Sequence, residues 1–466
     1  MSQTAPAALS DHNLILDTDS YKSSHFLQYP QGMTRIFSYL ESRGGKYPAT
    51  RFFGLQYILD KYLTRRVTDE DVEEARALIE AHGEPFPYDG WMRVVNVHGG
   101  KLPLEIRAVP EGTLVPIHNV LMSCTNTDPE LPWLVGWFET MLMRVWYPTT
   151  VCTQSYYIRE IIRQSLEKTS DRAADELPFK LHDFGSRGVS SRESAGIGGL
   201  AHLVNFQGSD TLEALRVGRN HYGADIAGFS IPAAEHSTIT SWGKEHEVDA
   251  YRNMVRQFGK KGGIFAVVSD SYDLKHAINV HWGETLRKEV EESGATLVVR
   301  PDSGDPPAMV RMAVNALAAK YGTTTNSKGF KVLNTVRVIQ GDGIDEQTIR
   351  QILQNLEVDG FSAENVSFGM GGALLQKVDR DTQRFAYKAS AGVVDGEYRG
   401  IYKDPVTDPG KRSKDGVLDL VEEGGRMVTK QYRTFDTDFP GSLMRVVYKD
   451  GELLVRDSLD EVRGRG

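Results

Sequence analysis

The sequence predicts an α/β protein with a (β/α) barrel-like core and a discontinuous outer α+β domain built from both chain ends. Two observations support this prediction. Short apolar runs that break into polar or glycine-rich turns recur six times between residues 179 and 379, and helix-like segments fill most gaps. Alternating apolar patterns follow this region, and the Asp-Gly pairs at Asp395 and Asp450 indicate two-residue hairpin turns.

The run Thr296–Arg300 is the clearest member of the repeated pattern. Its apolar residues are typical of a strand buried on both faces, and Asp302 and Ser303 follow almost at once. An arginine can bind a phosphate or a carbonyl through its fork of donors. The alternative interpretation is an ordinary turn in which Asp302 or Ser303 caps the next helix.

Five further apolar runs end in the same way. They end at Phe184, Ser230, Val268, Gln340 and Phe368. In parallel α/β folds, ligands bind at the carboxyl ends of the strands. Glycine-rich turns at 341–343 and 369–372 follow the last two runs, and the backbone N–H groups of such turns hold phosphate. The two turns favour a barrel, where phosphate binds at that place.

Ordinary domain sizes suggest how the chain divides. We expect residues 1–178 and 380–466 to form the outer domain, and residues 179–379 to form the barrel-like domain. In the outer domain the patterns predict a strand at 35–43, a helix that begins after Thr68, and two strands between residues 92 and 116.

Composition excludes several classes of protein. The net charge of −9 over 466 residues argues against a general nucleic-acid binder. No apolar run approaches ~20 residues, so no membrane span is expected. The first eleven residues lack the features of a signal peptide, and Cys124 and Cys152 are expected to be buried thiols in a reducing compartment, the cytoplasm. No His/Cys set has metal-site spacing, and no nucleophile elbow or Gly-x-x-x-x-Gly-Lys-Ser/Thr loop is present.

The residues after the predicted strands suit an activated sugar phosphate. They include two arginines, three acids and one histidine, namely Arg187, Arg300, Asp270, Asp302, Asp342 and His236. Glycine turns suit a phosphate monoester, and an acid beside them suits ribose hydroxyls. Arginines and the basic loop at 403–414 suit a diphosphate, and acids could hold Mg²⁺ with it.

Seven motifs resemble those of the nicotinamide phosphoribosyltransferases, which share the type II phosphoribosyltransferase fold with the nicotinate enzymes. They occur in matching order over almost the whole chain, at 17–22, 182–189, 201–206, 232–238, 300–304, 339–343 and 368–377. The resemblance implies a cytoplasmic homodimer with sites at the subunit interface. It also implies a reaction of NAD salvage, in which nicotinamide and 5-phosphoribosyl 1-diphosphate give nicotinamide mononucleotide and diphosphate.

The resemblance assigns four residues to the pyridine. Phe184 and Tyr21 of the partner subunit would sandwich the ring, Asp210 would accept from the amide NH₂, and Ser230 would lie nearby. Considered alone, Phe184 is more often a core residue and Asp210 more often caps the helix expected at 211–222.

The remaining roles concern the sugar, the phosphates and ATP. Arg187 and Arg300 would face the sugar phosphate and the amide oxygen, and Asp302 would hold ribose hydroxyls. The 5′-phosphate and ribose would be lined by Gly341, Asp342, Gly371 and Gly372. The diphosphate would be held, with Mg²⁺, by Arg43, Arg380, Lys388, Lys403 and Lys411, some of them from the partner subunit. His236 matches the family's phosphorylated histidine, through which optional ATP hydrolysis is coupled. The expected catalytic set is His236, Asp302, Arg300 and Asp210, without a resident metal.

Two departures from the family pattern stand out. Ser186 replaces a tyrosine, and the segment after Arg43 is shorter. Two other functions remain open at this point: a nicotinate phosphoribosyltransferase, and a non-catalytic binding or signalling protein on the same fold. Intact Arg187, Arg300, Asp302 and Asp342 argue against the second.

Overall fold

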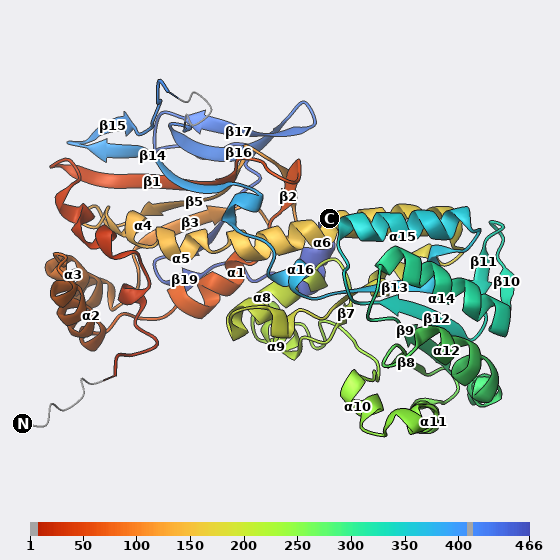
Figure 1. Ribbon diagram of the computed structural model, residues 1–466. Helices are drawn as coiled ribbons and strands as arrows, with labels where there is room; N and C mark the ends of the chain where they lie inside the picture. The colour runs from red at the N-terminus through yellow and green to blue at the C-terminus, as the bar shows by residue number, and fades with distance from the viewer. Residues whose placement is uncertain (1–7, 408–412) are drawn as a thin grey trace, which may run out of the picture. The chain divides into compact units, whose positions relative to one another are not determined.

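The computed structural model describes residues 8–407 and 413–466, and the chain forms two compact units (Figure 1). The first unit runs to Thr153, includes His221–Gly223 and resumes at Asp379, and the second holds the residues between. The predicted boundary at 178 therefore differs from the observed one at 153. Residues after Thr153 join the second unit because Gln154 donates to the carbonyl of Ala373, at 2.9 Å, and Ser155 lies 3.0 Å from His202.

The first unit is built on a seven-stranded antiparallel sheet with the order β15-β14-β1-β5-β3-β18-β19. Two smaller sheets, β2-β4 and β16-β17, accompany it. The strands are β1 (Met33–Ser42), β2 (Ala49–Arg51), β3 (Leu104–Ala108), β4 (Leu114–Pro116), β5 (Val120–Asn126), β14 (Phe385–Val394), β15 (Glu397–Gly400), β16 (Val417–Glu423), β17 (Arg426–Tyr432), β18 (Arg445–Lys449) and β19 (Glu452–Leu453).

Turn chemistry explains the two predicted hairpins. Asp395 and Gly396 have φ of 52° and 80° between β14 and β15, and Asp450 and Gly451 have 48° and 85° between β18 and β19. Positive φ at both central residues matches the right-handed twist of the flanking strands. The predicted strand at 35–43 and both hairpins are confirmed.

The expected pair of strands between residues 92 and 116 is wrong in its first half. Helix α3 (Tyr88–His98) occupies it, with Trp91 and Val94 buried on one face and Gly99 closing the helix at φ 60°. The valines of this segment resemble the alternating apolar positions of a strand. The two buried residues, Trp91 and Val94, are instead three positions apart, which is the spacing of one face of a helix. The other helices wholly in this unit are α1 (Leu55–Ile58), α2 (Asp69–His82), α4 (Leu134–Trp137), α5 (Glu139–Met143) and α17 (Leu459–Arg463). Thr68 caps α2 with a reciprocal bond from Asp71, as predicted.

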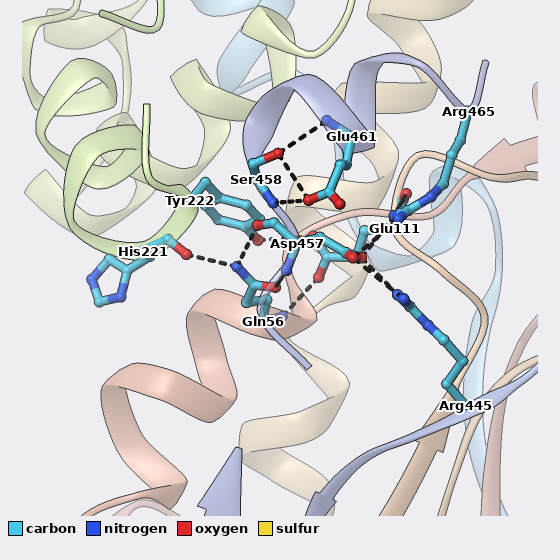
Figure 2. Close-up of polar contacts among 9 residues, drawn as sticks. All are labelled: Gln56, Glu111, His221, Tyr222, Arg445, Asp457, Ser458, Glu461 and Arg465. Atoms are coloured by element: carbon cyan, nitrogen blue, oxygen red, sulfur yellow. Dashed lines mark hydrogen bonds and ion pairs between the residues drawn. The ribbon is translucent and has the colours of Figure 1, made fainter. Parts of the chain in front are cut away.

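A buried polar network ties the end of the chain into the first unit (Figure 2). Glu111 accepts hydrogen bonds from the Gln56 N–H at 2.7 Å and the Tyr222 hydroxyl at 2.8 Å. Asp457 beside it binds Arg445 and Arg465 at 2.6 and 2.7 Å. Burial raises the pKa of Glu111 to about 7, although its hydrogen bonds act against this rise.

The second unit contains a six-stranded parallel sheet with the order β7-β6-β13-β12-β9-β8. Phe229 bridges to Gly208 at one edge and Ala233 bridges to Ala266 at the other, so a single short segment joins both edges. This curls the sheet into the predicted barrel-like core. The strands are β6 (Leu181–Asp183), β7 (Gly208–Ser209), β8 (Ile264–Val268), β9 (Thr296–Arg300), β12 (Val336–Gln340) and β13 (Val366–Met370), with a separate hairpin of β10 (Thr323–Thr325) and β11 (Lys331–Leu333).

Helices follow most strands of this sheet. They are α8 (Arg192–Leu203), α9 (Leu212–Tyr222), α10 (His236–Thr240), α11 (Glu247–Phe258), α12 (Leu274–His276), α13 (Arg287–Ser293), α14 (Pro306–Tyr321), α15 (Glu346–Val358) and α16 (Gly372–Leu375), and α6 (Trp146–Thr169) and α7 (Ala173–Glu176) precede the first strand. The run that ends at Ser230 forms the bridging segment and not a regular strand. No helix in the described part of the chain is long and apolar enough to cross a membrane.

Candidate active site

Phe184 lies just past β6 at the carboxyl edge of the parallel sheet. Its N–H donates to the carbonyl of Met370 at 2.9 Å, and its ring packs on Ala266, Val298 and Ile339. A Cβ at Gly369 would lie 2.2 Å from that ring, so only glycine fits there. The ring is partly buried, which leaves part of it available to a ligand.

Asp210 is held by two donors, one of which, His182, has its ring 4.8 Å from that of Phe184. His182 Nε2 donates to its Oδ1 at 2.7 Å, and the Ser230 hydroxyl donates to the same oxygen at 2.5 Å. Burial alone would raise the pKa of Asp210, but these bonds and the charges of His182 and Arg300 outweigh it and lower that pKa. Asp210 is therefore a carboxylate at neutral pH, and its side chain accepts from His182 and Ser230.

His236 begins α10 and faces two carboxylates from neighbouring strands. Its Nε2 lies 3.5 Å from Asp302 Oδ2 and 3.6 Å from Asp270 Oδ1, while its Nδ1 lies 3.0 Å from the Ser271 hydroxyl. The imidazole is 44% exposed, so a ligand can reach it.

Asp270 orders the loop after β9. Its Oδ2 accepts from the Asp302 N–H at 2.9 Å and from the Ser303 hydroxyl at 2.6 Å. Asp305, and not Asp302 or Ser303, caps α14, which leaves the Asp302 carboxylate available for other partners. The alternative in which Asp302 caps the helix is therefore wrong.

Two polar atoms of this cluster are buried and lack a hydrogen-bond partner among the residues that the structure describes. They are Asp270 Oδ1 and Arg300 Nε. Arg300 Nη2 lies 3.6 Å from Asp302 Oδ2, which is too long for a hydrogen bond. Buried polar atoms are normally paired, so this cluster has the chemistry of a site completed by a ligand.

The glycine-rich loops lie close to Phe184. A Cβ at Gly341 would be 3.5 Å from its ring, and one at Gly371 would be 3.5 Å from its carbonyl oxygen. Gly372 begins α16 and lies against Gly188, next to the exposed Arg187. The Asp342 carbonyl accepts from the buried Gln340 side chain at 3.0 Å, which fixes the loop after β12.

The expected diphosphate residues belong to the first unit. Burial lowers the pKa of Lys388, and the positive charges of Arg43, Lys403 and Arg380 lower it further, against the opposing charge of Glu139. These four cations are thus near enough to repel one another, as in a site for a multivalent anion. Arg43 is oriented by Glu41 at 3.0 Å. Lys411 lies outside the described residues.

Tyr21 also belongs to the first unit. Its ring is 57% exposed and meets His25 edge-on, with a centroid distance of 4.9 Å. Tyrosine side chains are more often largely buried, so the exposure of Tyr21 suits a residue that contacts a partner or a ligand.

No group of three or more His, Cys, Asp or Glu that could hold a metal occurs in the described ranges 8–407 and 413–466. A Mg²⁺ that arrives with diphosphate needs only one or two protein carboxylates, because it keeps phosphate and water ligands. Asp270, with one unpartnered oxygen among the described groups, and Asp302 fit that requirement.

Four contributors to this site were not predicted in these roles. His182 and Gly369 lie inside matched motifs, and their spacing from Phe184 is a usable signal. Asp270 and Ser271 follow β8; Asp270 was expected among the acids after the strands, but the contacts of both residues with His236 are evident only in the structure.

The parallel barrel-like core, with glycine-rich loops and the Phe184 ring at its carboxyl edge, fits a phosphoribosyltransferase. The model of the nicotinate phosphoribosyltransferase (NAPRTase) family matches residues 179–452, and that of the nicotinamide phosphoribosyltransferase N-terminal domain matches 13–106. A nicotinamide phosphoribosyltransferase of Xanthomonas campestris is 55% identical over 459 residues, covering 97% of each chain. The chain belongs to the nicotinamide phosphoribosyltransferase family.

Two solved structures share the fold. The nicotinate-nucleotide pyrophosphorylase of Pyrococcus furiosus superposes with a TM-score of 0.61 at 14% identity, covering 99% of this chain and 97% of that one. Human nicotinic acid phosphoribosyltransferase superposes with a TM-score of 0.57 at 19% identity, covering 96% and 92%. These matches support the predicted α/β fold with an additional domain.

Proposed function

We propose that this chain is a nicotinamide phosphoribosyltransferase, a pentosyltransferase that makes nicotinamide mononucleotide and diphosphate in NAD salvage. The observation that carries the proposal is the ionised Asp210, which is bound by His182, whose ring lies 4.8 Å from that of Phe184. A carboxylate in this position accepts from the NH₂ of a carboxamide and repels a carboxylic acid.

The mechanism needs no general base, because the pyridine nitrogen is a neutral nucleophile with no proton to lose. The chain's task is to hold that nitrogen in line with C1 of the sugar. Phe184 stacks on the ring, Asp210 sets its rotation, and Ser230 and His182 hold Asp210 in place. Asp302 takes the ribose hydroxyls, and Arg300 takes the amide oxygen or a phosphate oxygen.

Phosphate groups are held by two sets of residues. The 5′-phosphate is assigned to the glycine loops, with Gly341, Asp342, Gly371 and Gly372, and to Arg187. The diphosphate is assigned to Arg43, Arg380, Lys388 and Lys403, and to Lys411 from outside the described residues. Bound Mg²⁺, held by Asp270 and Asp302, would neutralise part of the charge that develops on departing diphosphate.

His236 is assigned to ATP coupling. The contacts that support this role are its exposed imidazole and the two carboxylates within 3.6 Å of Nε2, which can hold a protonated or phosphorylated ring in position. ATP is an optional second substrate in this proposal, and the phosphorylated imidazole is the intermediate.

We further propose a cytoplasmic homodimer with shared sites. Exposed aromatic side chains support the dimer: Tyr21 is 57% exposed, Phe229 54% and Phe179 47%, and the last two rings lie 6.3 Å apart. Cys124 and Cys152 are buried and form no disulfide bond, which supports a reducing compartment.

One assay tests the activity. Purified protein is mixed with Mg²⁺, phosphoribosyl diphosphate and either nicotinamide or nicotinate, and the mononucleotides are separated by chromatography. We expect nicotinamide mononucleotide from nicotinamide and little product from nicotinate. Absence of both products with a folded protein would refute the proposal.

A further inference from the structure

One face of the central sheet in the first unit is unexpectedly polar. Arg35 and Phe37 on β1, Ser123 and Thr125 on β5, and Glu105 and Arg107 on β3 line a cavity of about 260 Å³. The register explains this arrangement, because Phe37 and Glu105 both pair with Thr125, while Arg107 pairs with Ser123. Directly paired residues share a face of the sheet.

Small side chains make the floor of this cavity. Ser123 and Thr125 lie on the middle strand, where their buried positions would ordinarily be filled by larger apolar residues. Val417 and the segment that follows β17 close the cavity, with Phe435, Thr437 and Phe439 among its lining residues. The β16–β17 hairpin belongs to the same part of the fold (Figure 1).

Each arginine lies over an aromatic ring. The Arg35 guanidinium is 4.6 Å from the centroid of Phe435, and that of Arg107 is 4.2 Å from Phe439. Stacking holds a guanidinium in a fixed orientation and leaves its N–H edge free for an anion. Arg35 donates to Thr125 at 3.3 Å, and Arg107 donates to Ser442 at 3.1 Å.

The cation of Arg107 is not fully paired. Its Nε is buried and has no hydrogen-bond partner within the described ranges. The nearest carboxylate, Asp419, is 3.9 Å away, beyond hydrogen-bond distance. An unpaired buried donor of this kind costs free energy in the absence of a ligand.

Several carboxylates lie at or near the cavity. Glu105 is bound by Lys449 at 2.9 Å, and Asp438 is exposed. Asp419 Oδ1 accepts from the Ser442 hydroxyl at 2.7 Å, its Oδ2 is buried without a hydrogen-bond partner among the described residues, and burial raises its pKa, which favours the neutral acid. Burial lowers the pKa of Arg35, against the opposing charges of Glu105 and Asp436. An anion placed between the arginines would offset this cost of burial.

We infer that this cavity is a second ligand site, which takes the phosphate group of a small metabolite and is separate from the phosphate loops after β12 and β13. Two guanidiniums and two hydroxyls offer more donors than the two oxygens of a carboxylate can use, whereas a phosphate has three terminal oxygens. The volume leaves room for a small organic group on the phosphate.

Equilibrium dialysis of the full chain with labelled inorganic phosphate tests the inference. Ser123→Val fills the floor of the cavity and leaves both arginines in place. Cys124→Val is the matched control, because Cys124 is the next residue of β5 and faces the opposite side of the sheet. Arg35→Gln is a second variant, and glycerol 3-phosphate tests whether an ester also fits.

Wild type and Cys124→Val should bind one more equivalent of phosphate per chain than Ser123→Val and Arg35→Gln. All four proteins should keep the same kcat/KM for phosphoribosyl diphosphate. Equal phosphate stoichiometry in wild type and in both cavity variants would overturn the inference. The inference would also be overturned if Cys124→Val lost as much bound phosphate as the cavity variants.

Discussion

Replacing Asp210 by Asn should weaken the discrimination between nicotinamide and nicotinate. A nicotinate carboxylate at ~4 Å from Asp210 would be repelled by about 4 kcal/mol at an effective dielectric near 20. The Asp210 side chain is 45% exposed, so an effective dielectric of about 40 is more suitable and lowers the repulsion to about 2 kcal/mol. That energy corresponds to a factor of roughly 30 in kcat/KM.

The assay is the ratio of kcat/KM for the two pyridines in the wild type and in Asp210→Asn. Ser230→Ala is the control, because it removes the 2.5 Å hydrogen bond to Asp210 without removing the charge. We expect the ratio to fall about 30-fold in Asp210→Asn and to change little in Ser230→Ala. An unchanged ratio in Asp210→Asn would show that the carboxylate does not select the amide.

Three other perturbations test separate parts of the argument. Phe184→Ala should raise the KM for nicotinamide by roughly 10-fold through loss of about 1–3 kcal/mol of stacking and packing, and a steady-state titration against Phe184→Leu measures it. If sites are shared, mixed dimers of Tyr21→Ala and Phe184→Ala chains should recover activity, and inactive mixed dimers would contradict sharing. His236→Ala should retain synthesis at saturating substrate but lose stimulation by ATP, and loss of the ATP-free reaction in a folded variant would argue for a direct role. The folded pKa of Glu111, about 7, exceeds its unfolded value of about 4.5. The folded state therefore binds more protons between these values, and the free energy of unfolding should fall by about 3 kcal/mol as pH rises from 4.5 to 7. Urea titrations at several pH values should show this fall in the wild type and its absence in Glu111→Gln. If the free energy of unfolding depended on pH equally in both proteins, Glu111 would be excluded as the source of the fall.

Patterns within the sequence were sufficient for elements whose stability is local. The Thr68 cap, the Asp-Gly hairpins and the apolar strands β8, β9 and β12 were predicted because short-range bonds and burial periods determine them. The strand expected where α3 lies was wrong because this Val-rich segment fits both the two-residue period of a strand and the 3.6-residue period of a helix. The packing of Trp91 and Val94 decided in favour of the helix. β7 has two residues, too few for any periodic signal.

For the candidate site, too, the sequence predicted some features and the structure supplied others. The sequence by itself predicted roles for Phe184, His236, Arg300 and Asp302, because they lie in motifs whose order is specific, and for Asp210 through the same family resemblance. The tertiary structure decided which of their atoms meet: Asp210 with His182 and Ser230, and His236 with Asp270 and Ser271. These partners lie 20 to 35 residues apart in sequence, and only the parallel register brings their strand ends to one edge. The cavity between Arg35 and Arg107 had no sequence signal, since its six sheet residues come from three strands and share a face only through pairing.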